Sequence, residues 1–198
     1  MPEFLLPFTL FAIAGSFTPG PNNIMLTASG ANFGFRRTLP HILGICIGFP
    51  LMVTAIGLGL GRLFEEVPVT HSVLKLAGSA YLLWLAWRIA QAGSVDRPDA
   101  AARPLSFFQA AAFQWVNPKA WIMAVGAVST FTLAGQEMLP QVLTIAAIFT
   151  VVSVPSATVW TLLGIGVARI LTAPAGLRVF NLGMGALLAL SVVWILFE

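Results

Sequence analysis

The chain has 198 residues, of which 58% are hydrophobic and only 9% charged, and its mean hydropathy is +0.91. An ordinary soluble domain is about 25% charged, so the composition excludes a water-soluble fold and predicts a polytopic membrane protein. The net charge of +3 comes from basic and acidic residues scattered along the chain, which excludes a nucleic-acid-binding patch. Cys46 is the only cysteine, so an internal disulfide and a cysteine-based metal cage are both excluded.

Six stretches between charged residues are long enough to cross the hydrocarbon core, which takes about 20 apolar residues. In chain order they cover residues 4–35, 38–61, 71–92, 104–136, 138–168 and 179–197. The third is the least apolar, because Lys75 and Arg88 lie inside it. Long basic side chains near helix ends can reach the membrane interface. We therefore predict six spans, with five as the alternative if the third does not insert.

The first predicted span is interrupted near its middle by Thr18-Pro19-Gly20-Pro21-Asn22-Asn23. Proline lacks a backbone donor and clashes with the carbonyl group one turn earlier, so two prolines around a glycine predict an unwound turn. Free backbone groups in hydrocarbon cost several kcal/mol each unless they face protein or a watery cavity. The interruption therefore predicts a polar chamber at this depth.

The second predicted span contains Gly44 and Gly48, a spacing of small residues that lets helices approach closely. Such a pair serves either packing inside the protein or dimerisation. His41 and His71 fall near predicted span ends, where we expect them at the membrane interface. Two histidines are too few for a metal site, and we expect none.

The longest hydrophilic piece covers residues 88–103, near the middle of the chain. It predicts a cytoplasmic linker over residues 93–103 between two halves, residues 1–92 and 104–198, of a single membrane domain (1–198). Three spans in the first half are an odd number, so the second half enters the membrane from the opposite face. Many secondary transporters are inverted repeats of this kind. The predicted fold class is all-α, with six transmembrane helices in two inverted three-helix halves.

The fourth predicted span is broken by Asn117-Pro118-Lys119, so the two interruptions occupy equivalent places in the two halves. A charge near the bilayer centre costs about 3 kcal/mol, which something must offset. We therefore expect Lys119 to bind an anionic part of a substrate or to gate access to it, with Asn22, Asn23 and Asn117 supplying donors and acceptors. Alternatively, it caps carbonyl groups that the interruption frees, or it stays uncharged because burial disfavours the ammonium form.

The fifth predicted span carries a polar stripe, which suits either a pore lining or hydrogen bonds between helices. The stripe consists of Ser153, Pro155, Ser156, Thr158 and Thr161.

The charges of the loops predict the orientation of the chain. If the spans alternate, seven arginines fall on one side of the membrane and Arg62 and Lys75 on the other. The seven are Arg36, Arg37, Arg88, Arg97, Arg103, Arg169 and Arg178. Cytoplasmic loops are rich in lysine and arginine, so that side is predicted to be cytoplasmic and both termini periplasmic.

These motifs resemble those of the LysE/RhtB amino-acid exporters, a family similar in size and in its six hydrophobic segments. The resemblance covers nearly the whole chain, and its specific parts are Thr18-Pro19-Gly20-Pro21-Asn22-Asn23 and Asn117-Pro118-Lys119-Ala120. It implies a multi-pass protein of the bacterial inner membrane that exports amino acids, driven by the proton-motive force. The chain departs from the wider superfamily in having no Asp or Glu inside any predicted span.

The predicted function is a secondary transporter rather than an enzyme, exporting amino acids or related small zwitterionic metabolites by alternating access. The expected partners are the amino-acid substrate and membrane lipid, without nucleic acid or a cofactor, and a homo-oligomer is compatible with the sequence. The alternative is a non-transporting structural or accessory membrane subunit, which gives no reason for a lysine at mid-depth. The candidate substrate-binding residues are Thr18, Pro19, Gly20, Pro21, Asn22, Asn23, Asn117, Pro118 and Lys119.

Overall fold

The structure, a computed structural model, describes residues 2–60, 68–92, 103–133, 135–171 and 173–197. Over these residues the chain forms helices and turns without a strand, which confirms the predicted all-α class. The helices are α1 Pro2–Phe17, α2 Pro21–Ala55, α4 Pro68–Gln91, α5 Phe107–Phe113, α6 Pro118–Phe131, α7 Met138–Ile170 and α8 Pro174–Phe197. A π-helical turn, η1 Ile56–Leu60, follows α2, and a 3-10 turn, η2 Gln114–Val116, follows α5. Of the predicted linker, residues 93–102 lie outside the described part of the chain.

Both predicted interruptions are present and share one backbone pattern. α1 ends at Phe17 and α2 begins at Pro21, while α6 begins at Pro118 after η2. The residue before each proline is extended, with φ 178° and ψ 175° at Gly20 and φ −90° and ψ 107° at Asn117. A proline ring disfavours helical backbone in the preceding residue and fits the first turn of a new helix. Each interruption is therefore a local stop and restart; we call residues 18–20 the first break and Asn117 the second break.

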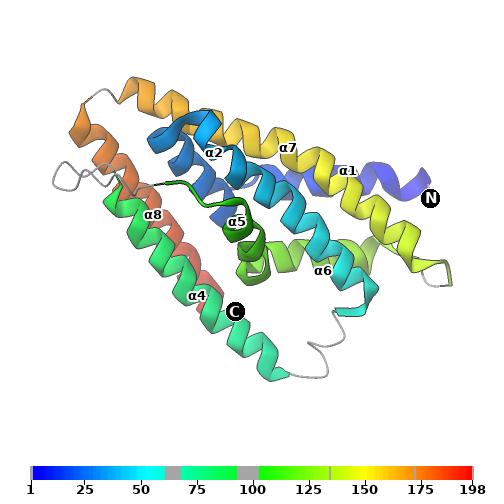
Figure 1. Ribbon diagram of the computed structural model, residues 1–198. Helices are drawn as coiled ribbons and strands as arrows, with labels where there is room; N and C mark the ends of the chain where they lie inside the picture. Colours follow the sequence, from blue (N-terminus) through cyan, green and yellow to red (C-terminus); the bar gives the residue numbers. More distant parts are fainter. Residues whose placement is uncertain (1, 61–67, 93–102, 134, 172, 198) are drawn as a thin grey trace.

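Helix α2 contains the reversal between the first two predicted spans. Gly34 has φ 74° and ψ 175°, a conformation that residues with a β-carbon rarely adopt. Figure 1 shows the chain turning back at this point, so α2 consists of two helical stretches, residues 21–33 and 35–55. The sequence prediction placed the end of the first span at residue 35, next to this turn, and the boundary stays a prediction.

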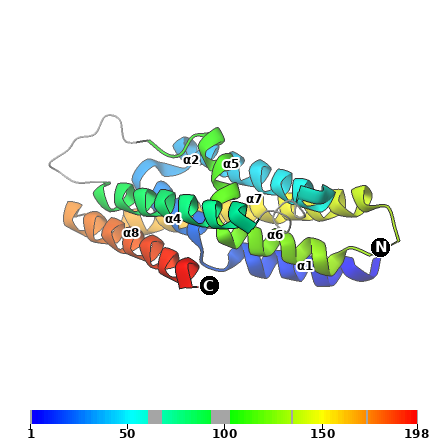
Figure 2. The ribbon, with the colours of Figure 1, turned by 90° about the horizontal axis from the view of Figure 1, so that it is seen from below.

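Long helices crossing one another organise the molecule. α2 packs against α7 along much of its length, and α4 and α8 lie side by side at the opposite flank in both views (Figures 1 and 2). One apolar cluster joins α2, α4, α5 and α8 and includes the fully buried Leu82 and Leu188. A second cluster joins α1, α2, α6 and α7 around Phe8 and Phe149. The two breaks lie where these clusters meet.

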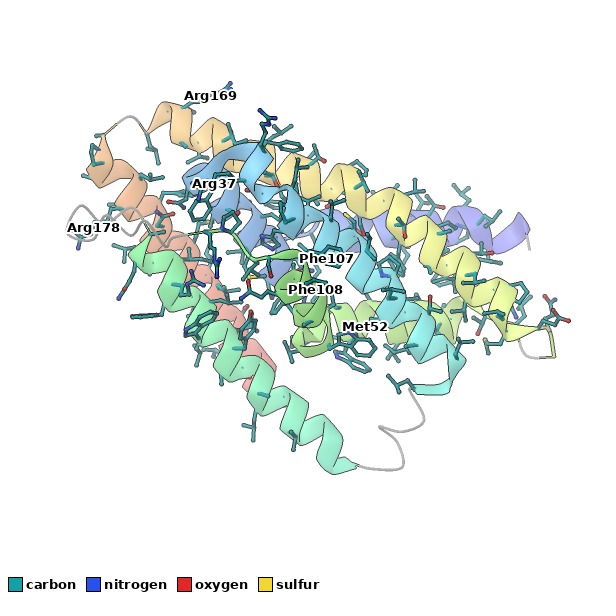
Figure 3. All side chains as sticks on the ribbon, in the orientation of Figure 1. Arg37, Met52, Phe107, Phe108, Arg169 and Arg178 are labelled. Carbon is teal, nitrogen blue, oxygen red and sulfur yellow. The ribbon has the colours of Figure 1, made fainter. Side chains whose placement is uncertain are left out.

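Three helical stretches are long and apolar enough to cross a membrane by length and composition: Pro21–Leu60, Met138–Ile170 and Pro174–Val193. Many large hydrophobic side chains face outward, among them Leu6, Phe108 and Val151, and a lipid environment suits such a surface. Figure 3 shows Arg169 and Arg178 at the same end of the molecule as Arg37. The count of six spans and the inverted relation of the two halves stay predictions.

The glycine pair of α2 serves packing inside the protein. A β-carbon at Gly48 would lie 2.6 Å from the α-carbon of Ala111, and one at Gly44 would run into the carbonyl oxygen of Phe107. α5 therefore covers this face of α2, so Gly44 and Gly48 are not free to form a dimer contact.

The sequence predicts His41 at the membrane interface, and the structure encloses its side chain in protein. Its side chain is 1% exposed, and Thr38, one helical turn earlier on the same face, is fully buried. This end of α2 is covered by protein because the chain folds back at Gly34, which the position of His41 in a hydrophobic stretch does not reveal. The side chain of His71 lies outside the described part of the chain.

Candidate functional site

The two breaks meet in space although Thr18 and Lys119 are 101 residues apart in the chain. The Lys119 ammonium group, in the first turn of α6, donates to the Thr18 carbonyl oxygen at 2.7 Å and to Thr18 Oγ1 at 2.9 Å. It also donates to the Pro19 carbonyl oxygen at 3.1 Å. The lysine therefore caps carbonyl groups that the first break frees, the structural role that the sequence left open.

A pair of amide side chains forms a second connection between the breaks. Asn22 Nδ2 donates to Gln114 Oε1 at 2.8 Å, and Gln114 Nε2 donates back to Asn22 Oδ1 at 3.2 Å. Gln114 is fully buried and also donates to the carbonyl oxygen of Ala110 at 2.8 Å. Because both amides are satisfied by each other, this pair fixes the start of α2 against η2.

Side chains from other helical turns also serve carbonyl groups at the end of α1 and in the first break. Asn23 Nδ2 donates to the carbonyl oxygens of Ser16 at 2.9 Å and Thr18 at 2.8 Å. Ser156, from α7, donates through Oγ to the Ser16 carbonyl oxygen at 2.7 Å. The unwound backbone is thus paired within the protein, as a break in an apolar environment requires.

A cavity of about 60 Å³ lies at the junction of the two breaks. Its wall draws on both apolar clusters, through Leu26 and Ala157 from one and Phe49 and Met123 from the other. The polar part of the wall consists of Ser16, Asn22, Asn23, Gln114, Asn117, Lys119, Ser153 and Ser156. These lining residues include one cation, amides and hydroxyls but no carboxylate, so the wall suits an anionic group beside neutral polar groups.

Among the polar lining residues in the described part of the chain, Asn117 is the one whose side-chain oxygen is both buried and unpaired. The residue is 2% exposed, and its buried Oδ1 has no hydrogen-bond partner in the described part of the chain. Its backbone carbonyl is satisfied, since it accepts from the amides of Ala120 and Trp121 at 3.0 and 3.2 Å. A buried acceptor without a partner is costly, and a donor group of a bound solute would remove that cost.

The structure brings most of the predicted site residues to the cavity. Gly20, Asn22, Asn23, Asn117 and Lys119 line it. Thr18 accepts hydrogen bonds from Lys119 and Asn23, and Pro19 accepts one from Lys119. The two remaining prolines act by starting α2 and α6.

Sequence reasoning missed Gln114 and Ser16. A glutamine in an apolar span, one helical turn before Asn117, is the signal that would have found Gln114. The polar stripe of the fifth predicted span serves both of its suggested roles, because Ser153 lines the cavity and Ser156 lines it while also bonding to α1. Ser16 offers no comparable signal, since it contributes a carbonyl group.

Comparison with known proteins agrees with this architecture. The LysE type translocator family matches residues 13–196, which include both breaks. Cysteine/O-acetylserine efflux proteins of Escherichia coli (strain K12), Shigella sonnei (strain Ss046) and Shigella flexneri are each 31% identical over 164 residues. The alignments cover 82% of this chain and 83% of each relative. No solved structure gives a significant match. The family resemblance is confirmed, and the chain belongs to the LysE type translocators, as a multi-pass membrane protein.

Proposed function

We propose that this protein is a secondary transporter of the bacterial inner membrane that exports amino acids or related small zwitterionic metabolites by alternating access. The observation that carries the proposal is the meeting of two interrupted helices at one polar cavity. Membership of a translocator family supports it. A structural or accessory subunit would have no use for a buried, unpaired acceptor at such a junction.

The chemistry of the cavity wall fits a zwitterion. Lys119 and the N-termini of α2 and α6 favour a carboxylate, because a helix N-terminus carries partial positive charge. Asn117 is a lining residue whose buried Oδ1 has no partner among the described residues, and we propose that it moves to accept a hydrogen bond from the ammonium group of the solute. The apolar side chains of Leu26, Phe49 and Met123 complete the wall beside these groups.

Small neutral amino acids are the first solutes to test. The cavity measures about 60 Å³ and offers no carboxylate to a cationic side chain. Relatives at 31% identity are named for the efflux of cysteine and O-acetylserine. We therefore propose these two compounds as candidate substrates of this protein.

The proposed topology has six spans in two inverted halves, a cytoplasmic linker at residues 93–103 and both termini in the periplasm. The gathering of Arg37, Arg169 and Arg178 at one end supports it (Figure 3). A reporter fused after Glu198 tests the orientation. We expect activity from a reporter that works only in the periplasm, and activity from a cytoplasmic reporter alone would contradict the topology.

The decisive experiment measures efflux of a panel of labelled amino acids from vesicles that contain the purified protein. We expect export of at least one small neutral amino acid, and a loss of about tenfold or more in Lys119→Ala and Asn22→Ala. Lys75→Ala is the matched control, because Lys75 is the only other lysine in the chain and lies away from the cavity lining. Unchanged efflux in both site variants would remove the site assignment, and no efflux by the wild type would remove the function.

A further inference from the structure

The hydrogen bonds of Lys119 suggest how solute binding and helix movement are linked, if the proposed function holds. We propose that Lys119 is a latch between the two breaks, opened by the carboxylate group of the solute. The latch consists of the three hydrogen bonds from the Lys119 ammonium group to Thr18 and Pro19. The ammonium group either ties the first break to α6 or binds the solute, and it cannot do both fully.

The donors of the ammonium group are all in use. Lysine has three N–H donors and no acceptor, and three oxygen atoms of the first break receive them at 2.7, 2.9 and 3.1 Å. The side chain also lies directly over Gly20, where a β-carbon would come within 2.6 Å of Lys119 Cδ. A carboxylate that enters the cavity can therefore bind Lys119 only when at least one of these bonds breaks.

Opening the latch leaves few groups unpaired. The Thr18 carbonyl oxygen still accepts from Asn23 Nδ2 at 2.8 Å. Thr18 Oγ1 still donates to the Gly15 carbonyl oxygen at 3.0 Å. Of the three acceptors, only the Pro19 carbonyl oxygen loses its recorded partner, and Pro19 is exposed. Release of the lysine therefore leaves a single carbonyl group of the first break, that of Pro19, without its hydrogen bond.

A carboxylate is a stronger partner for Lys119 than the oxygens it now holds. Hydrogen bonds between two ionised groups are shorter and about twice as strong as neutral ones, and no lining residue is acidic. A solute without a carboxylate has no comparable group to offer. The latch therefore selects amino acids over the corresponding amines.

The consequence of opening is local to one helix. The hydrogen bonds of Lys119 connect the end of α1 to α6, whereas the Asn22–Gln114 pair connects α2 to η2 and does not involve the lysine. When a solute takes Lys119, α1 loses its polar tie to α6 while α2 keeps its tie to η2. Binding at the cavity would release the end of α1 from α6 alone, because Asn23 and Ser156 still donate to the Ser16 carbonyl oxygen.

Binding to purified protein under reducing conditions tests the latch with three pairs of compounds that differ only in the carboxyl group. The pairs are cysteine and cysteamine, serine and ethanolamine, and alanine and ethylamine. We expect at least one of these amino acids to bind wild type at least tenfold more tightly than its amine. Lys119→Gln should abolish this preference.

Thr18→Val distinguishes the latch from a lysine that only supports the fold, because only the latch predicts tighter binding of the amino acid by this variant. It keeps the shape of threonine and removes one latch acceptor, so the Kd of the amino acid should fall by about threefold to tenfold. Lys119→Gln should raise the Kd, in the opposite direction. Thr9→Val is the matched control, because Thr9 makes only a bond within α1, to the Leu5 carbonyl oxygen at 2.6 Å, and its Kd should not change.

Three results would overturn the latch. Weaker binding in both Thr18→Val and Lys119→Gln would show that the lysine only supports the fold. Equal binding of amino acid and amine by wild type would show that the carboxylate does not open it. Absence of binding for all three amino acids would also reject it. Vesicle efflux distinguishes the failure of the latch from the failure of the proposed function. If one of these three results is found and the protein still exports amino acids, only the latch is rejected. If the protein exports no amino acid, the proposed transport function is rejected as well.

Discussion

At the first break, side chains from other helical turns satisfy the freed backbone, whereas backbone and packing hold the second. Lys119 and Asn23 serve carbonyl groups of the first break, and Asn23 and Ser156 serve the Ser16 carbonyl group just before it. At the second, Asn117 donates its amide hydrogen to the Gln114 carbonyl oxygen at 3.3 Å in a tight turn, and Gly78 of α4 lies against the carbonyl of Val116. Side chains can exchange partners without moving a helix, so the first break is the part of the junction that can change, and the second can change only together with α4.

The largest difference in stability between the two breaks should appear when a methyl group is added at Gly20, in the first break, and at Gly78 of α4, which packs against the second break. A β-carbon at Gly78 would run into the backbone carbonyl of Val116, whereas one at Gly20 would meet only the flexible stem of Lys119. We expect Gly78→Ala to lower the free energy of unfolding by about 2–3 kcal/mol. Gly20→Ala should lower it by less than about 1 kcal/mol, yet reduce amino-acid export several-fold because Lys119 is displaced.

Thermal unfolding in detergent and vesicle efflux measure the two effects of these glycine variants. Gly126→Ala is the control, since its β-carbon would have a single ordinary contact, 3.8 Å from Phe11 Cζ. Equal destabilisation by Gly20→Ala and Gly78→Ala would mean that the first break is as rigid as the second.

The next largest effect concerns Asn23 and Asn117, where we expect one substitution to lower stability and the other to lower transport. Asn23 satisfies the carbonyl groups of Ser16, in α1, and of Thr18, in the first break, so Asn23→Ala should cost about 1–2 kcal/mol of folding free energy. Asn117 Oδ1 is a buried acceptor without a partner in the described part of the chain, so its removal should not lower the free energy of unfolding. Asn117→Ala should nevertheless reduce export about tenfold or more, because the solute loses its acceptor. Normal export by a stable Asn117→Ala protein would exclude Asn117 from the binding site.

Local chemistry made the breaks predictable from sequence. Gly20-Pro21 and Asn117-Pro118 each restrict the backbone at the residue before proline, whatever the rest of the chain does. Their equal depth in two hydrophobic stretches suggested that they meet, and the contact of Lys119 with Thr18 shows that they do.

The parts that sequence did not predict depend on tertiary neighbours. Gln114 gains its role from Asn22, which is 92 residues away in the chain, and His41 is buried by segments that its own stretch does not specify. Gly44 and Gly48 suited either packing or dimerisation until the position of α5 was known. A spacing within one helix identifies a close contact but not the partner.

The smallest predicted effect tests whether the two breaks act as one unit. Asn22 and Gln114 exchange two hydrogen bonds across the junction, so the double variant Asn22→Ala/Gln114→Ala should be more stable than the sum of the single effects predicts. The reason is that each single change leaves the other amide buried without its partner, a penalty that the double change avoids. We expect a coupling energy of about 1 kcal/mol from a double-mutant cycle of unfolding free energies.

Asn22→Ala/Asn181→Ala provides the matched cycle, because Asn181 pairs with Asn32 instead and shares no partner with Asn22. Its two single effects should add within about 0.5 kcal/mol. If the single effects of Asn22→Ala and Gln114→Ala on the unfolding free energy also add, then water satisfies the remaining amide in each single variant without a loss of stability. The second break would then stand without help from the first, and the Lys119 hydrogen bonds would be the only polar tie between them among the described residues.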